Sequence, residues 1–136
     1  MSVPVNKRKE SQLEVNLMAR DLCVYTLQIT SNEKHFPKSQ DSFTQIIRLT
    51  AIHLYSLCWE ANNIMVNGDI KRYEMRMELQ AQALDKCNSL CALIDIAKPL
   101  FHLSSKQVKY WTMKVVELRN YIYKWHINDK KRLKPE

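Results

Sequence analysis

The chain has 136 residues, a length typical of one domain, and it contains only one glycine and four prolines. So few turn-forming residues exclude a sheet-rich fold, which needs many tight turns, and they favour long uninterrupted helices. The net charge of +7 favours a negatively charged partner, such as a phosphate backbone, an acidic protein or an anionic membrane surface.

Apolar residues recur at spacings of three and four along four stretches of the chain, the pattern of helices with one buried face. We predict helices over residues 11–31, 39–67, 70–100 and 104–130. Because short connections force neighbouring helices to run antiparallel, the expected fold is an all-α, up-down-up-down four-helix bundle over residues 11–130. Residues 1–10 are expected to form a flexible basic tail, and residues 131–136 a basic C-terminal tail.

The first predicted helix, over residues 11–31, has a start and a stop that the sequence marks. Ser11 is followed three residues later by Glu14, the pattern of a capping box at a helix N-terminus. Pro37 disfavours a helical conformation at the residue before it, so the first helix cannot continue through it. Phe36, the one large apolar residue of this connection, is expected to plug the end of the bundle.

The second and third predicted helices, over residues 39–67 and 70–100, are separated by the sharpest break in the sequence, Asn67-Gly68-Asp69. Gly68 suits the left-handed conformation that follows a helix end, and Asp69 can cap the helix that comes next. The apolar stripe of the third helix is interrupted by one polar residue, Gln80.

The fourth predicted helix, over residues 104–130, opens with Ser104 and Gln107, a second capping-box pattern. Its apolar seam, which we expect to lie in the core, consists of Val108, Trp111, Val115, Leu118, Ile122 and Trp125. The helix ends in a cationic segment, because six basic residues between Arg119 and Lys134 accompany a single acid, Asp129.

The expected topology gathers three basic segments at one pole of the bundle. The start of the first helix, the turn between the second and third, and the end of the fourth all lie there. Such a cationic surface suits sequence-independent contacts with phosphates. We expect the nucleic-acid contacts to come from Lys7, Arg8, Lys9, Lys71, Arg72, Arg76, Arg119, Lys124, Lys130, Lys131 and Arg132.

Aromatic residues outside the seams form a second candidate site. Tyr55 and Trp59 lie four residues apart and off the main stripe of their helix, which indicates a second packed face. Tyr110, Tyr121 and Tyr123 lie off the seam of the last helix and alternate with basic residues. These three could line a protein interface, stack on single-stranded nucleic acid or belong to an ordinary surface. We favour an oligomer or partner interface for all five.

The sequence holds no convincing catalytic or metal-binding set. Cys87 and Cys91 could bind zinc together with a histidine, but both fall on an apolar stripe and are better explained as core residues. His53 lacks the partners of a nucleophilic site, and Glu74 and Glu78 lie among basic residues that would form an ion-paired surface. We therefore predict a protein that is not an enzyme and that uses no metal or cofactor.

The chain is expected to work in the cytoplasm. It has no apolar run near the ~18 residues of a membrane span. Its first residues also lack the apolar core of a signal peptide. In a reducing compartment the four cysteines would be free thiols.

Short motifs within residues 15–132 resemble those of a known bacterial family. They are His35-Phe36-Pro37-Lys38, Gln45-Ile46-Ile47-Arg48-Leu49, Glu60-Ala61-Asn62-Asn63, Leu103-Ser104-Ser105-Lys106, Trp111, Arg119-Asn120 and Trp125. They look like the four-helix-bundle family that includes ribosomal-RNA intervening-sequence proteins and the accessory variability determinant (Avd) of diversity-generating retroelements. The intervening-sequence branch closes its second helix with Asn-Ile-Ala-Glu-Gly, whereas here Met65-Val66-Asn67-Gly68 replaces the last part. The end of the chain looks more like the Avd branch.

The resemblance implies a non-catalytic accessory protein that forms a homopentamer of four-helix protomers with basic surfaces. It also implies association with the reverse transcriptase of a diversity-generating retroelement, and with its template RNA or complementary DNA. The residue patterns independently agree on an all-α bundle, on the lack of a catalytic set and on a cationic surface.

Two other interpretations stay open. A protein–protein scaffold of the intervening-sequence type would use the basic pole to meet an acidic patch on its partner and would bind no nucleic acid directly. A metal-dependent enzyme would use Cys87, Cys91 and a histidine.

Overall fold

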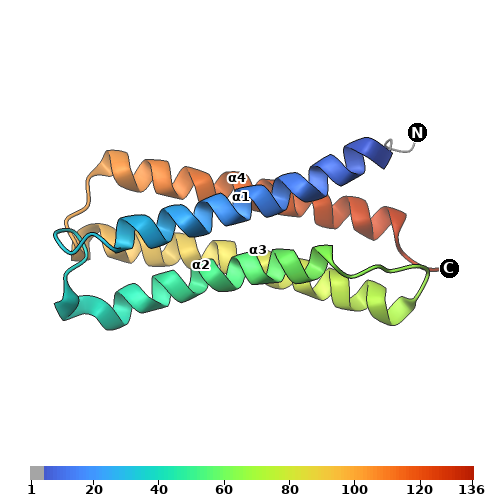
Figure 1. Ribbon diagram of the computed structural model, residues 1–136, viewed down its shortest axis with the longest axis horizontal. Coiled ribbons are helices and arrows are strands. Elements are labelled where there is room, and N and C mark those ends of the chain that lie inside the picture. Colours follow the sequence, from blue (N-terminus) through green and yellow to red (C-terminus); the bar gives the residue numbers. More distant parts are fainter. Residues whose placement is uncertain (1–4) are drawn as a thin grey trace.

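A computed structural model describes the backbone of residues 5–136 and the side chains of residues 14–136. The described part is all-helical: α1 covers Val5–Thr30, α2 Asp41–Asn62, α3 Ile70–Leu100 and α4 Ser105–Arg132, with a short 3-10 helix, η1, at Lys38–Gln40. The helices run alternately in opposite directions, so that the start of α1, the α2–α3 connection and the end of α4 share one end of the molecule (Figure 1). The predicted four-helix bundle is confirmed.

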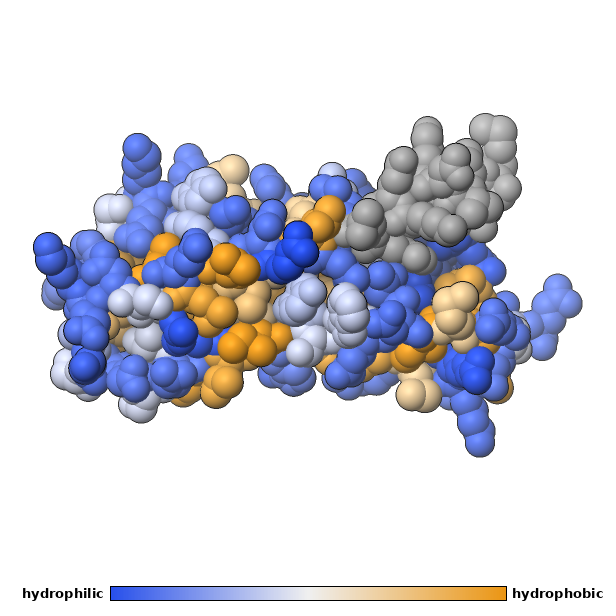
Figure 2. Space-filling model, viewed as in Figure 1, coloured by the Kyte–Doolittle hydropathy of each residue, from blue (hydrophilic) through white to orange (hydrophobic). Residues whose placement is uncertain are grey.

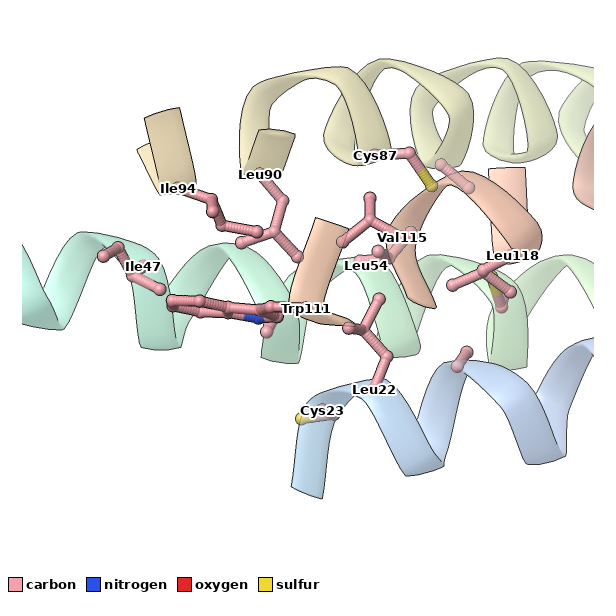
Figure 3. Packing of buried hydrophobic residues seen from close by; sticks show 14 of the residues in the cluster. Leu22, Cys23, Ile47, Leu54, Cys87, Leu90, Ile94, Trp111, Val115 and Leu118 are labelled. Atoms are coloured by element: carbon pink, nitrogen blue, oxygen red, sulfur yellow. The ribbon is translucent and has the colours of Figure 1, made fainter. Parts of the chain in front are cut away.

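The four helices form a closed ring of neighbours around one core. α1 packs against α2 and α4, and α3 packs against the same two helices, so α2 and α4 lie diagonally across the bundle. The predicted seam of α4 lies in this core, with Trp111, Val115, Leu118 and Ile122 fully buried. Figure 3 shows that seam between residues from the other three helices, among them Leu22, Leu54 and Leu90.

Two helix boundaries differ from the predicted ones by more than two residues. α1 begins at Val5 rather than at residue 11, which places Ser11 inside the helix, and the side chain of Ser11 lies outside the described residues. α2 ends at Asn62 rather than at residue 67, and residues 63–69 form an extended connection in which Val66 is buried. The predicted range of α3 is confirmed.

The connection from α2 to α3 ends in a tight turn. Asp69 N donates to Val66 O at 2.9 Å across Asn67 and Gly68, which both have positive φ, at 49° and 77°. Paired positive φ values are typical of the Asn-Gly turn. Asp69 then caps α3, because its side chain accepts hydrogen bonds from the backbone N–H groups of Lys71 and Arg72. The predicted left-handed conformation of Gly68 and the predicted cap by Asp69 are thus confirmed, but Gly68 lies in the turn before α3 rather than directly after the end of α2.

The opposite end of the bundle is closed by aromatic rings. The ring of Phe36 lies 4.9 Å from that of Phe101 and 6.3 Å from that of Trp111, measured between centroids. Trp111 Nε1 donates to Thr26 Oγ1 at 3.0 Å, so its buried polar atom has a partner. Ser104 caps α4 by accepting from Gln107 N at 3.1 Å, as predicted. Phe36 is therefore the predicted plug.

Candidate nucleic-acid interface

The end of the bundle where α3 begins and α4 ends is organised by a buried carboxylate, Asp129. Its Oδ2 accepts hydrogen bonds from Arg76 Nε at 2.8 Å and from Gln80 Nε2 at 2.8 Å. Its Oδ1 accepts from Arg132 Nη2 at 2.9 Å. We call Arg76, Gln80, His126, Asp129 and Arg132 the Asp129 cluster. The carboxylate is fully buried, and charge-assisted hydrogen bonds to both oxygens replace its hydration.

Arg76 is buried, which corrects the prediction that it contacts phosphate. Its side chain is 3% exposed, and its guanidinium lies 5.3 Å from the centre of the Trp125 ring. Besides Asp129, it donates from Nη1 to Ala61 O at 3.2 Å and to Ile64 O at 3.0 Å. Ala61 lies in the last turn of α2, where its carbonyl also accepts from Ile64 N at 3.2 Å, and Ile64 lies just beyond the helix end. All these hydrogen bonds of Arg76 are made inside the bundle.

The Asp129 cluster fixes how three helices meet. Arg76 joins α3 to Asp129 of α4 and to the carbonyl oxygens at the end of α2. A buried ion pair adds little net stability compared with apolar residues of the same shape, but the loss of one partner leaves an uncompensated buried charge. The cluster therefore penalises any other register of α3 against α4.

His126 extends the cluster toward the surface. Its Nδ1 lies 2.8 Å from Gln80 Oε1. Since the Gln80 amide donates to Asp129 through Nε2, Oε1 is left as an acceptor, and His126 Nδ1 must carry the proton that it shares. Burial lowers the pKa of His126 below its usual value, the charge of Lys130 lowers it further, and Asp129 opposes both effects.

The basic segments at the start of α3 and the end of α4 are neighbours, as predicted. Tyr73 Oη donates to Lys130 O at 3.4 Å, beside the Arg76–Asp129 pair. Lys71, Arg72, Lys124, Lys130 and Lys131 are exposed there. Arg132 is half-buried and ion-paired with Asp129. Two acids of α3, Glu74 and Glu78, are also exposed on this end, so its surface charge is mixed.

Four residues of the predicted nucleic-acid surface lie elsewhere or outside the description. Lys7, Arg8 and Lys9 belong to the first turns of α1, and their side chains lie outside the described residues. Arg119 lies near the middle of α4, away from the basic end, and donates to Asn88 Oδ1 of α3 at 2.9 Å. The described basic end therefore consists of Lys71, Arg72, Lys124, Lys130, Lys131 and Arg132, with Lys134 beyond them.

Four of the five predicted interface aromatics are exposed, Tyr55 is half-buried against the core, and the five do not gather in one place. Trp59 is 52% exposed, and its ring lies 6.4 Å from that of Tyr55. Tyr110, Tyr121 and Tyr123 are exposed on α4, which does not pack against α2. The structure thus separates these five residues into an α2 pair and an α4 group.

The cysteines are buried or half-buried and unpaired, as the prediction of free thiols requires. Burial raises the pKa of the Cys58 thiol to about 12 and also raises that of Cys87. Among the described residues, no three His, Cys, Asp or Glu side chains lie close enough to share a metal ion. Within the same part of the chain, no helix is both long and apolar enough to cross a membrane.

Asp129 and Gln80 hold this end of the bundle together, a role that was not predicted from the sequence. Asp129 follows Trp125 by four residues and so continues the spacing of the α4 seam, while Gln80 lies on the apolar stripe of α3. Two polar residues on facing seams are the signal of a buried polar pair.

Comparison with known proteins adds no relative: no family model, no curated protein and no solved structure matches the chain. The resemblance to the Avd and intervening-sequence family therefore rests on the sequence motifs alone.

Proposed function

We propose that the chain is a non-catalytic accessory protein of the Avd kind, which binds nucleic acid in the cytoplasm and assists the reverse transcriptase of a diversity-generating retroelement. The observation that carries the proposal is a basic end whose geometry is fixed from within. Because the Asp129 cluster ties the start of α3 to the end of α4, the backbone positions of the lysines around it are already fixed relative to one another before a ligand binds.

The exposed side chains of this end suit phosphate rather than bases. Lys71, Arg72, Lys130 and Lys131 are exposed cations with no ion-pair partner among the described residues. Such contacts are sequence-independent and release counterions, so binding would fall steeply with salt. The exposed Glu74 and Glu78 reduce the net charge of this end and would favour ligands that keep clear of these two carboxylates.

The test is a titration of a fluorescently labelled RNA stem-loop with the full chain at several salt concentrations. We expect the logarithm of the association constant to fall linearly with the logarithm of the salt concentration. The Lys130→Glu/Lys131→Glu variant should weaken binding by about tenfold or more, since two phosphate contacts become repulsions.

A matched control is Lys34→Glu/Lys38→Glu, which reverses two exposed lysines at the opposite end. That control should stay within about twofold of the unmodified chain. Equal losses in both variants, or binding that salt does not change, would contradict a dedicated basic end.

The link to a retroelement is tested by the neighbourhood of the gene and by the purified partner. A reverse-transcriptase gene and a repeated template beside it are expected, and that reverse transcriptase should co-purify with the chain. A position inside a ribosomal-RNA gene would instead favour the intervening-sequence branch.

The homo-oligomer that the resemblance implies is supported by a separate observation. Hydrophobic residues gather on the face seen in Figure 2, where α1 and α2 lie nearest the viewer. The exposed members on these two helices are Leu17, Val24, Ile46, Leu49, Ile52 and Trp59. A face of this kind is typical of an interface.

The resemblance implies a pentamer, and sedimentation equilibrium measures it directly. The unmodified chain is expected to sediment as a pentamer, and Trp59→Glu is expected to shift it toward the monomer because a charge would enter the interface. A monomer at all concentrations would remove the oligomer from the proposal while leaving RNA binding as a separate question.

A further inference from the structure

The first half of α4 carries two neighbouring apolar hollows on its outer side. One, of about 580 Å³, lies toward α3; its lining includes Lys98, Val108, Lys109, Thr112, Met113 and Val116. The other, of about 420 Å³, lies toward α1; its lining includes Tyr25, Lys106, Lys109, Tyr110 and Met113. Because the hollows share Lys109 and Met113, they form one continuous surface, which we call the α4 groove.

The α4 groove leaves large apolar side chains in water. Met113 is 49% exposed and Tyr110 is 54% exposed, and Val108 and Val116 are only half-buried beside them. Val108 belongs to the α4 seam and packs against the core from the floor of the groove, whereas Tyr110, Met113 and Val116 are not part of the core cluster. The core therefore does not need these three to be apolar. An apolar surface without a structural role is typical of a binding site.

The rim of the groove is strongly cationic. Lys98, Lys106 and Lys109 are exposed, and Lys114 stands over the ring of Tyr110 at 5.1 Å. Glu117 is the one acidic residue in the lining of the two hollows. A partner that fills the hollows and carries carboxylates around its apolar part would match both features.

The start of α4 shows a local conflict that such a partner would relieve. The positive end of a helix dipole favours acidic residues in the first turn. The first turn of α4 has none and instead contains Lys106. A lysine at the unfavourable end of the dipole weakens the helix, and local conflicts of this kind concentrate at functional sites.

We propose that the α4 groove docks an acidic amphipathic helix from a partner protein. Its apolar side chains, one helical turn apart, would enter the hollows on both sides of Met113, and its carboxylates would face Lys98, Lys106 and Lys109. Nucleobase stacking fits less well, because Lys114 already occupies a face of Tyr110. The α4 groove shares no residue with the basic end, so the two proposals stand or fall separately.

The experiment uses the full chain and a fluorescein-labelled synthetic peptide. The peptide has about 18 residues, or five helical turns, with Leu and Phe along one face and Glu elsewhere. A second peptide has the same composition in scrambled order, so that no apolar face forms. Fluorescence anisotropy is expected to show saturable binding of the first peptide and at least about tenfold weaker binding of the second.

Charge and apolar variants then locate the site. Lys106→Glu/Lys109→Glu and Met113→Asp should each weaken the binding of the first peptide by about tenfold or more, while Lys130→Glu/Lys131→Glu stays within about twofold. All these positions are exposed, and circular dichroism should show unchanged helix content. Lys106→Glu should also melt no lower than the unmodified chain, because it places an acid at the start of α4.

Three results would overturn the proposal. The first is no saturable binding of the amphipathic peptide, and the second is equal binding of the scrambled one, which would show attraction by charge alone. The third is an RNA stem-loop or an anionic phosphatidylserine vesicle that binds more tightly than the peptide and loses binding in Lys106→Glu/Lys109→Glu. That result would assign the α4 groove to a different class of partner.

Discussion

The two ends of the bundle are closed in opposite ways. At one end the rings of Phe36, Phe101 and Trp111 meet, and the polar atom of Trp111 is satisfied by Thr26. At the other end a guanidinium and a carboxylate, Arg76 and Asp129, are buried together among hydrogen bonds. The aromatic end is stabilised by the burial of apolar area. The polar end depends on counter-charges and hydrogen-bond partners for its buried charged groups.

The difference shows which end is specialised. An apolar closure is tolerant, because hydrophobic residues of similar volume can replace one another at small cost. A polar closure is intolerant, because each lost partner leaves a buried charge unpaired. The intolerant end is the one that carries the exposed lysines of α3 and α4, so the more rigid closure lies beside those lysines.

The largest expected effect comes from breaking the polar end alone. Asp129→Ala leaves the Arg76 guanidinium buried without its counter-charge, and we expect the free energy of unfolding to fall by about 3–5 kcal/mol. Urea denaturation followed by circular dichroism measures the loss. The double variant Arg76→Met/Asp129→Leu should lose less than Asp129→Ala, because it removes both charges together. If the free energy of unfolding of Asp129→Ala lies within about 1 kcal/mol of that of the unmodified chain, water or a rearranged partner must compensate the charge of Arg76.

The aromatic end should respond differently to an equally drastic change. Phe101→Ala removes a buried ring, and we expect a loss of about 3 kcal/mol in the free energy of unfolding. Because Phe36 contacts Phe101, Phe36→Ala should lower the free energy of unfolding by less in the Phe101→Ala variant than in the unmodified chain. A double-mutant cycle measures this difference. RNA affinity should stay unchanged in Phe101→Ala under conditions where the variant is folded. A parallel loss of RNA binding would mean that the two ends are coupled.

The two ends also differ in how far the sequence could predict them. Phe36 is a lone large apolar residue before a proline, so its role as a plug follows from local sequence. Arg76 belongs to a basic run at a helix start, which suggests a surface residue, although it falls on the three-and-four spacing of the buried face of α3, between Tyr73 and Gln80. Its partners are two carbonyl oxygens at and just beyond the end of α2, Ala61 O and Ile64 O, and the carboxylate of Asp129 on α4. These are long-range facts that spacing within one helix does not contain.

A smaller effect on stability is expected at the polar end when the pH is lowered. The pKa of folded His126 lies below its unfolded value of about 6.5, because burial and Lys130 disfavour the charged ring. A lowered folded pKa means that its stabilising effect is complete above pH ~6.5 and is lost as the pH falls toward the folded value. The midpoint temperature of thermal unfolding should therefore decrease when the pH is lowered below ~6.5. The drop should be smaller in His126→Gln, and an identical pH profile in that variant would assign the effect to other groups.

The smallest expected effect is a gain at the aromatic end. His102 has a positive φ of 55° where the α3–α4 connection turns, and Leu103 N donates back to Lys98 O at 3.0 Å, as in a Schellman motif. Glycine adopts this conformation without the steric penalty of a side chain, although it also gains freedom in the unfolded chain. We expect His102→Gly to raise the free energy of unfolding by about 0.5 kcal/mol, measured by urea denaturation. His102→Ala, which keeps the Cβ, should show no such gain, and equal gains in both variants would place the strain in the imidazole. A gain from His102→Gly alone would show that the aromatic end leaves some stability unused at a position whose backbone conformation favours glycine.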